Sequence, residues 1–246
     1  MRTIALVTGI LIAACSSGDD PGSPAVCGPN GSCPSGYTCS AQSNLCLRSG
    51  SAGDAGGQSA AFASGADWPS FDGDLGGAHG ASLGNAKAVC VSPSVPASCP
   101  TGGLAFRTSG AGWNATVTAA PGAIWIWRGD VSPSGLSDLQ FAVFEKTFTL
   151  GASPSGTIQV AADDFVEVRV NGSVAGSAGS VTDETVAYSG QSAVTTFDLG
   201  PLLQAGENTI TIIAQNGPQA FGSCATPCPF TVNMAGVVFG GVLSWH

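Results

Sequence analysis

Short runs in which hydrophobic and polar residues alternate dominate the C-terminal two thirds of the chain. Residues 141–150 put their apolar side chains mainly on one face, as expected for a half-buried strand. Residues 158–162 and 166–170 alternate in the same way, and Asn171-Gly172 after them is typical of a type I′ hairpin turn. Further strands are predicted at 124–127, 195–199, 208–214 and 237–245.

About eight such strands with no long helical period predict an all-β protein, an antiparallel β-sandwich or jelly roll. Composition supports this prediction. Only 9% of the 246 residues are charged, against about 25% in an average soluble domain, which excludes a long coiled coil. The 36 glycines have no period of three, which excludes collagen. The net charge is −9 and no basic cluster occurs, so nucleic acid is not an expected partner.

The first fourteen residues have the pattern of an export signal. Arg2 precedes a hydrophobic run over residues 4–14 that is too short to cross a bilayer. The sequence Ile-Ala-Ala-Cys at residues 12–15 resembles a bacterial lipobox, which implies that Cys15 is lipidated and becomes the N-terminus. An ordinary secretory signal is the alternative. Ser16 follows Cys15, and in bacterial lipoproteins the absence of Asp there implies an outer-membrane location, facing either the surface or the periplasm.

The number of cysteines fits an exported protein. With Cys15 lipidated, eight of the nine cysteines remain, enough for four disulfides in an oxidising compartment. These eight are Cys27, Cys33, Cys39, Cys46, Cys90, Cys99, Cys224 and Cys228. We expect local pairs, Cys90 with Cys99 and Cys224 with Cys228, and two bridges among the first four. Pairing between the two later groups is the alternative. The spacings do not match those of a zinc site.

Composition divides the chain into five parts. A signal peptide (1–14) and a tether (15–26) precede a Cys-rich module (27–47), which has too few apolar residues for a core and must be held by crosslinks. This module resembles small Cys-rich units that follow the lipobox in many bacterial surface proteins. A Gly/Ser/Ala-rich segment (48–66) is predicted to be a flexible linker, and residues 67–246 the β-sandwich domain, with its core at about 104–246.

Five segments resemble, in order, those of the galactose-binding-like β-sandwich family. They are AIWIW (123–127), FEKTFTL (144–150), IQVAADDFVEVRVNGSVAG (158–176), DLGPLLQAGENTITIIAQN (198–216) and NMAGVVFGG (233–241). The resemblance implies a jelly roll of the kind found in carbohydrate-binding domains and beside the catalytic domains of glycosidases. It does not specify a ligand. Family members often read Asn-Pro-Ala-Gly where this chain has Met234 in the second position.

Three polar residues are candidates for ligand contacts. Asp163 and Asp164 follow a strand and could bind calcium or sugar hydroxyls, because carboxylates suit hard cations and polyols. A turn in which they accept backbone N–H bonds is the structural alternative. Asn216, at the end of a strand, could line a ligand loop or lock the backbone. No cofactor is expected apart from this structural calcium.

Four tryptophans, Trp113, Trp125, Trp127 and Trp245, are the candidates for stacking on a sugar ring. Trp113 is the candidate that we retain for ligand binding. Trp125 and Trp127 project from the same face of a strand, and Ile124 and Ile126 occupy the other face. This pattern predicts a strand that is buried on both sides, so we expect both tryptophans to be in the core.

The chain is predicted not to be an enzyme. Residues 80–84, Gly-Ala-Ser-Leu-Gly, match the G-x-S-x-G motif, but a nucleophile elbow needs a hydrophobic strand before it and a helix after it. Neither is predicted there. The two histidines, His79 and His246, lie in no recognisable catalytic pattern. Carboxylate pairs of the glycosidase type are not excluded by this argument.

The leading hypothesis is a lipid-anchored cell-surface protein that binds a glycan through its β-sandwich. The alternative is a structural or protein-interaction module of the envelope without a small ligand, and an accessory hydrolase ranks third. The sequence indicates no oligomeric state. One electrostatic prediction follows from strict alternation, which places Lys146 among apolar side chains. We expect Asp163 or Asp164, one hairpin away, to pair with it, unless a bulge turns Lys146 toward solvent.

Overall fold

The computed structural model is almost entirely β-structure. It describes residues 32, 37–40, 45–48, 57–76, 79–94, 99–100, 102–108, 112–218 and 227–246. The predicted signal peptide, lipidation site and tether lie outside the described residues, as do Cys27, Cys33 and Cys224. Among the described residues, no helix has both the length and the apolar character needed to cross a membrane.

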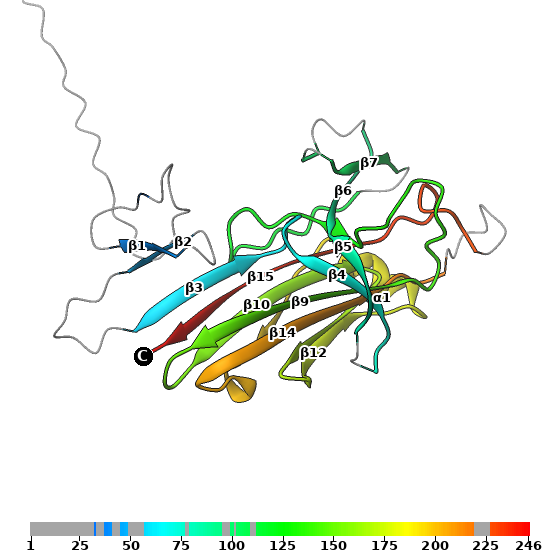
Figure 1. Ribbon diagram of the computed structural model, residues 1–246. Coiled ribbons are helices and arrows are strands. Elements are labelled where there is room, and N and C mark those ends of the chain that lie inside the picture. Colours follow the sequence, from blue (N-terminus) through cyan, green and yellow to red (C-terminus); the bar gives the residue numbers. More distant parts are fainter. Residues whose placement is uncertain are drawn as a thin grey trace, which may run out of the picture.

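Two sheets contain most of the described strands (Figure 1). The first sheet has the order β13-β10-β15-β8-β6-β7, and β3 also pairs with β15. Its strands are β3 (Gln58–Ala63), β6 (Lys87–Ser92), β7 (Leu104–Arg107), β8 (Ile126–Trp127), β10 (Ser155–Asp163), β13 (Thr195–Asp198) and β15 (Gly236–Trp245). Neighbouring strands in this sheet are antiparallel except for β6 and β7, which run parallel.

The second sheet has the order β12-β11-β14-β9-β4-β5 and is antiparallel throughout. Its strands are β4 (Pro69–Gly73), β5 (His79–Asn85), β9 (Phe141–Leu150), β11 (Phe165–Val170), β12 (Ser173–Gly179) and β14 (Gly206–Gln215). A separate hairpin joins β1 (Tyr37–Ser40) to β2 (Leu45–Arg48), and one short helix, α1 (Glu184–Gly190), follows β12. The predicted all-β sandwich is confirmed.

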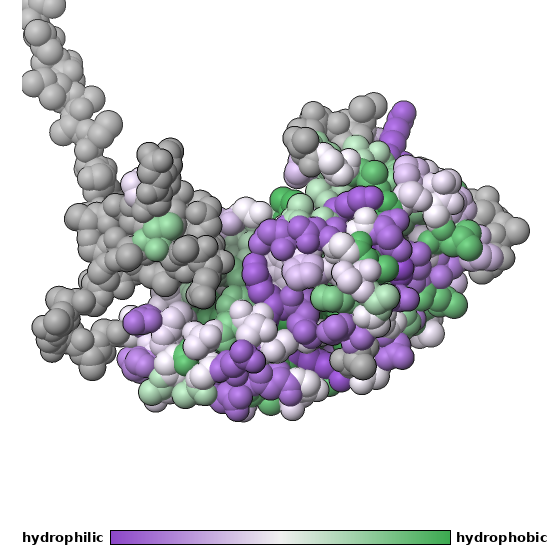
Figure 2. Space-filling model, in the orientation of Figure 1, coloured by the Kyte–Doolittle hydropathy of each residue, from purple (hydrophilic) through white to green (hydrophobic). Residues whose placement is uncertain are grey.

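The core lies between the sheets and follows the predicted alternation. Val166, Val168 and Val170 of β11 are fully buried, and the residues between them are partly exposed. Phe144 of β9 and Phe239 of β15 meet across the core with ring centroids 6.2 Å apart. The surface seen in Figure 2 shows hydrophobic residues scattered among hydrophilic ones. The apolar side chains of the strands are therefore largely internal.

The hairpin predicted at Asn171-Gly172 joins β11 to β12. Both residues have positive φ, 53° and 80°, as a type I′ turn requires. The side chain of Asn171 also bridges to the neighbouring strand, because its Oδ1 accepts the backbone N–H of Thr209 at 2.9 Å. This contact secures the turn against β14.

The sandwich starts earlier in the chain than residue 67. Residues 58–63, inside the segment predicted to be a linker, form β3 and pair with β15 from Gly240 to Trp245. The apolar run in β3 explains this, because Ala60, Ala61 and Phe62 are buried. Residues 69–73 and 79–85 form the hairpin β4–β5, which extends the second sheet beside β9.

The expected pairing of Lys146 with Asp163 or Asp164 is wrong. Lys146 Nζ lies 2.9 Å from Asp67 Oδ2 and 5.1 Å from the centroid of the Trp68 ring. The reason is topological: β9 and β10 follow each other in sequence but belong to different sheets, and β9 is flanked by β14 and β4. Asp67 immediately precedes β4 and so lies beside β9.

A disulfide joins Cys90 to Cys99 as predicted. Cys39 and Cys228 are also disulfide-bonded. The pairings predicted for them involve cysteines outside the described residues or side chains, and they stay predictions.

Candidate functional site

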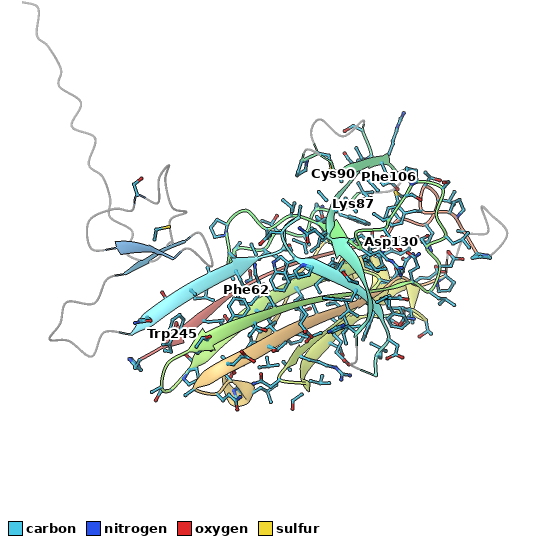
Figure 3. All side chains as sticks on the ribbon, in the orientation of Figure 1. Phe62, Lys87, Cys90, Phe106, Asp130 and Trp245 are labelled. Atoms are coloured by element: carbon cyan, nitrogen blue, oxygen red, sulfur yellow. A yellow bond between two sulfur atoms is a disulfide. The ribbon has the colours of Figure 1, made fainter. Side chains whose placement is uncertain are left out.

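A groove with aromatic walls lies at one edge of the first sheet. Its volume is about 460 Å³, within the usual range for small-ligand sites. We call it the tryptophan groove. It is lined by Val89, Cys90, Val91, Ser92, Ser94, Pro100, Trp113, Ala123, Ile124 and Trp125. In Figure 3, Cys90 lies on the part of β6 that projects from the sandwich next to β7, where Phe106 is also labelled.

Two half-buried indoles form one wall of the groove. The ring centroids of Trp113 and Trp125 are 4.7 Å apart, and their planes are inclined by 33°. Backbone bonds hold both residues to β6, because Trp113 N donates to Val91 O at 3.3 Å and Val89 N donates to Trp125 O at 2.9 Å. The pair is therefore positioned by the sheet edge, although both residues lie outside regular strands.

Both tryptophans were expected in the core. Trp127 is fully buried, but Trp125 is only partly buried, so the expectation is wrong for Trp125. The strand β8 comprises only Ile126 and Trp127. The alternation that was used to bury Trp125 together with Trp127 therefore does not extend back to Trp125, which lies in the preceding loop.

Gly236, at the start of β15, provides the space in which the two indoles lie. A Cβ added at this position would come within 2.5 Å of Trp113 Cζ3 and 3.2 Å of Trp125 Cε3. Only a residue without a side chain allows both rings to lie this close to the strand. Sequence reasoning did not identify this role, although the motif around residues 233–236 had been singled out.

Asp163 lies behind the groove wall at the end of β10, opposite Gly236 of β15. It is only 9% exposed. The indole N–H of Trp113 donates to Asp163 Oδ2 at 3.0 Å, and Gln191 Nε2 donates to Asp163 Oδ1 at 2.6 Å. Asp163 thus links Trp113, in the wall of the tryptophan groove, to Gln191, which caps the C-terminus of α1.

Asp164, the next residue, points to a different partner. Its Oδ2 accepts the backbone N–H of Gly217 at 2.6 Å, and its carboxyl interacts electrostatically with that of Asp163. Burial raises the pKa of Asp163 well above its usual value, and the charge of Asp164 raises it further. Burial also raises the pKa of Asp164, against the opposing effect of the Gly217 N–H. The two carboxyls therefore form a pair that retains a proton more readily than free aspartates do.

Asn216 is fully buried and faces away from solvent. Its Nδ2 donates to Ser137 O at 2.9 Å and to Asn233 O at 3.5 Å. Asn216 therefore makes no direct surface for a ligand, but it holds together the loops that precede β9 and β15. It lies next to Gly217, so all four candidates, Trp113, Asp163, Asp164 and Asn216, gather at one end of the sandwich.

No three side chains of His, Cys, Asp or Glu within the described part of the chain come together as a metal site. Both oxygens of Asp163 accept side-chain N–H bonds, which leaves them poorly disposed toward a cation. The G-x-S-x-G segment at residues 80–84 lies within β5, and another strand, β6, follows it. This placement differs from the strand–turn–helix arrangement of a nucleophile elbow.

Comparison with known proteins gives only distant similarities. No protein-family model and no curated protein matches the sequence. An FMN-binding β-glucuronidase from Facaelibacterium prausnitzii L2-6 has 16% identity and a TM-score of 0.34, with 76% of this chain and 22% of that chain covered. A putative β-galactosidase from Bacteroides fragilis has 16% identity and a TM-score of 0.35, with 75% and 23% covered.

A lectin from Pleurotus ostreatus in complex with GalNAc has 23% identity and a TM-score of 0.30, with 47% of this chain and 28% of that chain covered. The chain thus spans less than a third of the length of each of these three proteins. At such TM-scores we take nothing about the site or the ligand from these similarities.

The prediction that the chain is not an enzyme is contradicted and is withdrawn, because glycosidases are among the structures that it resembles. The resemblance does not show an activity either. The chain covers only 15% to 23% of these glycosidases, at 16% identity.

Proposed function

We propose that this protein binds a carbohydrate in the tryptophan groove. The observation that carries the proposal is the pair of half-buried indoles, 4.7 Å apart, that lines a recess of about 460 Å³. The apolar face of an indole packs well against the C–H groups on one face of a pyranose ring. Aromatic walls with a few polar groups are the usual composition of a small-ligand site.

Polar groups of the groove suit sugar hydroxyls. Ser92 and Ser94 place their hydroxyl oxygens 3.2 Å apart at the rim, and each hydroxyl can donate and accept. Within the described part of the chain, the indole N–H of Trp125 has no hydrogen-bond partner, whereas that of Trp113 is bound to Asp163. None of the lining residues is charged. We therefore propose a neutral sugar rather than a uronic acid.

Asp163 serves this site indirectly, as a positioning residue. It is buried behind Trp113 and fixes the orientation of that indole through the 3.0 Å hydrogen bond. A fixed aromatic wall costs less ordering on binding than a mobile one. In this proposal Asp164 and Asn216 stabilise the loops around the groove and do not touch the sugar.

We also propose that the protein is anchored in the bacterial outer membrane through a lipid on Cys15. The support for this is the hydrophobic run that ends in Ile-Ala-Ala-Cys at residues 12–15. Cys15→Ser removes the thiol that would carry the lipid, so it should move the protein from the membrane fraction to the soluble fraction. Equal labelling of the wild type and the variant by a radioactive fatty acid would overturn the anchor.

A glycan array tests the binding proposal. The wild-type chain should bind at least one neutral glycan, and Trp125→Ala should lose that binding. Tyr188→Ala is the matched control, because Tyr188 is an aromatic residue that is 51% exposed on α1 and does not line the groove. An array on which the wild type binds nothing, or on which Trp125→Ala binds as the wild type does, would contradict the proposal.

A further inference from the structure

A small socket opens between α1, β10 and β12. Its volume is about 70 Å³, and it shares no lining residue with the tryptophan groove. Apart from Ser189 and Thr195, the residues that line it are valine, alanine or glycine, and none is charged. Val186 lines the socket and is 40% exposed, so the socket reaches the surface. An apolar cavity of about 150 Å³ holds benzene, so about half that volume suits one short aliphatic side chain.

The socket lies on the core side of β12, at the margin of the sandwich. Ala178 of β12 lines it and pairs with Val166, a buried core residue of β11, so the two side chains share a face. Thr195, which also lines the socket, belongs to β13. β12 and β13 are the terminal strands of the second and the first sheet. A further strand beside β12 would therefore direct alternate side chains toward the socket.

β12 presents an unprotected edge. It is the last strand of the second sheet, and among the described residues its backbone hydrogen bonds reach only β11 (Figure 1). Sheet edges are usually protected by charged residues or proline. The sequence of β12, Ser-Val-Ala-Gly-Ser-Ala-Gly, contains neither. After the register shift opposite Val168 and Arg169, residues 176–179 pair regularly with β11. Their outer edge is therefore a template for an added strand.

The charge around this edge is negative. No Lys or Arg follows Arg169 in the sequence, whereas four acidic residues do. Asp183 and Glu184 are exposed at the start of α1, and Asp198 is exposed on β13. Arg169, on the strand next to β12, is paired with Glu167 at 2.7 Å. A second copy of this chain would bring the same negative groups to the edge, whereas a basic segment is complementary to it.

We propose that β12 binds an extended, basic segment of a partner protein, which adds a strand to the second sheet and places a short aliphatic side chain in the socket. Main-chain hydrogen bonds to β12 supply affinity in this mode of recognition. The socket and the acidic groups beside it supply specificity. The inference does not depend on glycan binding, because the socket and the tryptophan groove are formed by different residues.

Selection from a library of random peptides tests this inference on the full chain. Peptides of about seven residues, within the usual length of a strand, are displayed on phage. The enriched sequences should contain lysine or arginine together with valine, isoleucine or leucine. A synthetic copy of the most enriched peptide should bind in solution, measured by fluorescence anisotropy. Raising NaCl to about 0.5 M should weaken this binding, because salt screens the attraction between exposed charges.

Two variants at exposed positions block the site. Ser177→Lys places a charge on the edge of β12, as protected edges have, and Ala193→Leu fills the socket. Each should weaken peptide binding at least about tenfold. Ser134→Lys and Ala105→Leu are the matched controls, because both residues are exposed and neither lies on β12 or lines the socket. Both controls should bind the peptide as the wild type does.

Four outcomes overturn the inference. In the first, the selection enriches no peptide, or the enriched peptides lack basic residues. In the second, Ser177→Lys binds the peptide as tightly as the wild type does, and in the third Ala193→Leu does so. If one variant does not fold, as judged by circular dichroism, the other decides. In the fourth, sedimentation equilibrium shows a wild-type dimer that Ser177→Lys dissociates, which would assign the edge to a second copy of the chain.

Discussion

The indole N–H of Trp113 and the carboxyl of Asp163 are joined by a 3.0 Å hydrogen bond, although 50 residues separate them in sequence. The bond connects the wall of an open groove to a carboxyl that is 9% exposed. It also connects the groove to the Asp163–Asp164 pair, whose protonation changes with pH. The stability of this end of the sandwich should therefore depend on pH.

The raised pKa of Asp163 and Asp164 predicts that stability falls as the pH rises. The folded state holds a proton that the unfolded chain releases near its ordinary pKa of 3.8. The contribution of the pair is complete below that value and is lost as the pH rises through the raised pKa. Urea unfolding at intervals from about pH 4 to about pH 8 should show this fall, and Asp164→Asn should reduce it. An unchanged slope in Asp164→Asn would refute the assignment to this pair.

The Arg128–Asp130 pair should act in the opposite direction. Its hydrogen bond with Arg128 lowers the pKa of Asp130 below 3.8. A lowered carboxyl pKa gives stability that is present above 3.8 and is lost as the pH falls through the lowered value. Asp130 therefore affects stability below its ordinary pKa, whereas the Asp163–Asp164 pair affects it above that value. The loss of stability expected above about pH 4 is thus not due to Asp130.

Gly236→Ala should disturb the groove wall. The added Cβ would approach Trp113 Cζ3 to 2.5 Å, so the indole or the strand must move. We expect a loss of about 1–3 kcal/mol in the free energy of unfolding, typical of an overpacked site, and a shift in tryptophan fluorescence. Adding Trp113→Phe should recover part of the loss, because phenylalanine lacks the atoms that collide. Strictly additive losses in the double variant would argue against this contact.

Replacing both Cys90 and Cys99 by serine should destabilise the part of β6 that lines the tryptophan groove. The disulfide closes a short loop with a separation of 9 residues, so its removal should cost about 2–3 kcal/mol of stability. Because Cys90 lines the groove, affinity for a glycan found on the array should fall as well. Thermal unfolding and titration measure the two effects separately. Lost stability with unchanged affinity would place the ligand elsewhere.

Lys146→Met should be tolerated. Lys146 pairs with Asp67, but the two side chains are 31% and 69% exposed, and pairs of this kind contribute about 0–1 kcal/mol. The aliphatic stem can continue to pack as methionine near the Trp68 ring. Urea unfolding should show a change below about 1 kcal/mol. A loss above about 2 kcal/mol would mean that the contact with Asp67 and Trp68 is stronger than such exposure allows.

Local pattern was enough to predict several strands of the sandwich and the hairpin turn, but not β3 to β7 or β12. The alternation in residues 166–170 became β11, and Asn171-Gly172 took up the positive φ values that the turn requires. These features depend on neighbours in sequence. The sandwich as a fold class followed from their number and spacing.

The arrangement of the site depends on contacts between distant parts of the chain. The register of β10 and β15 sets Asp163 opposite Gly236, and the irregular loop from Trp113 to Trp125 folds over them. Neither the register nor the loop path is encoded in a local pattern. The same limit explains the error over Lys146, because sequence order suggested that β10 was its neighbour, whereas the sheet places Asp67 there.

Isothermal titration of the wild type, Trp125→Ala and Tyr188→Ala with the strongest glycan from the array tests the central claim most directly. The wild type and Tyr188→Ala should bind equally. Trp125→Ala should bind about thirty-fold more weakly, a loss of about 2 kcal/mol, as expected for a central aromatic contact. Equal affinity in all three proteins, with the folded state of each confirmed by circular dichroism, would contradict binding in the tryptophan groove.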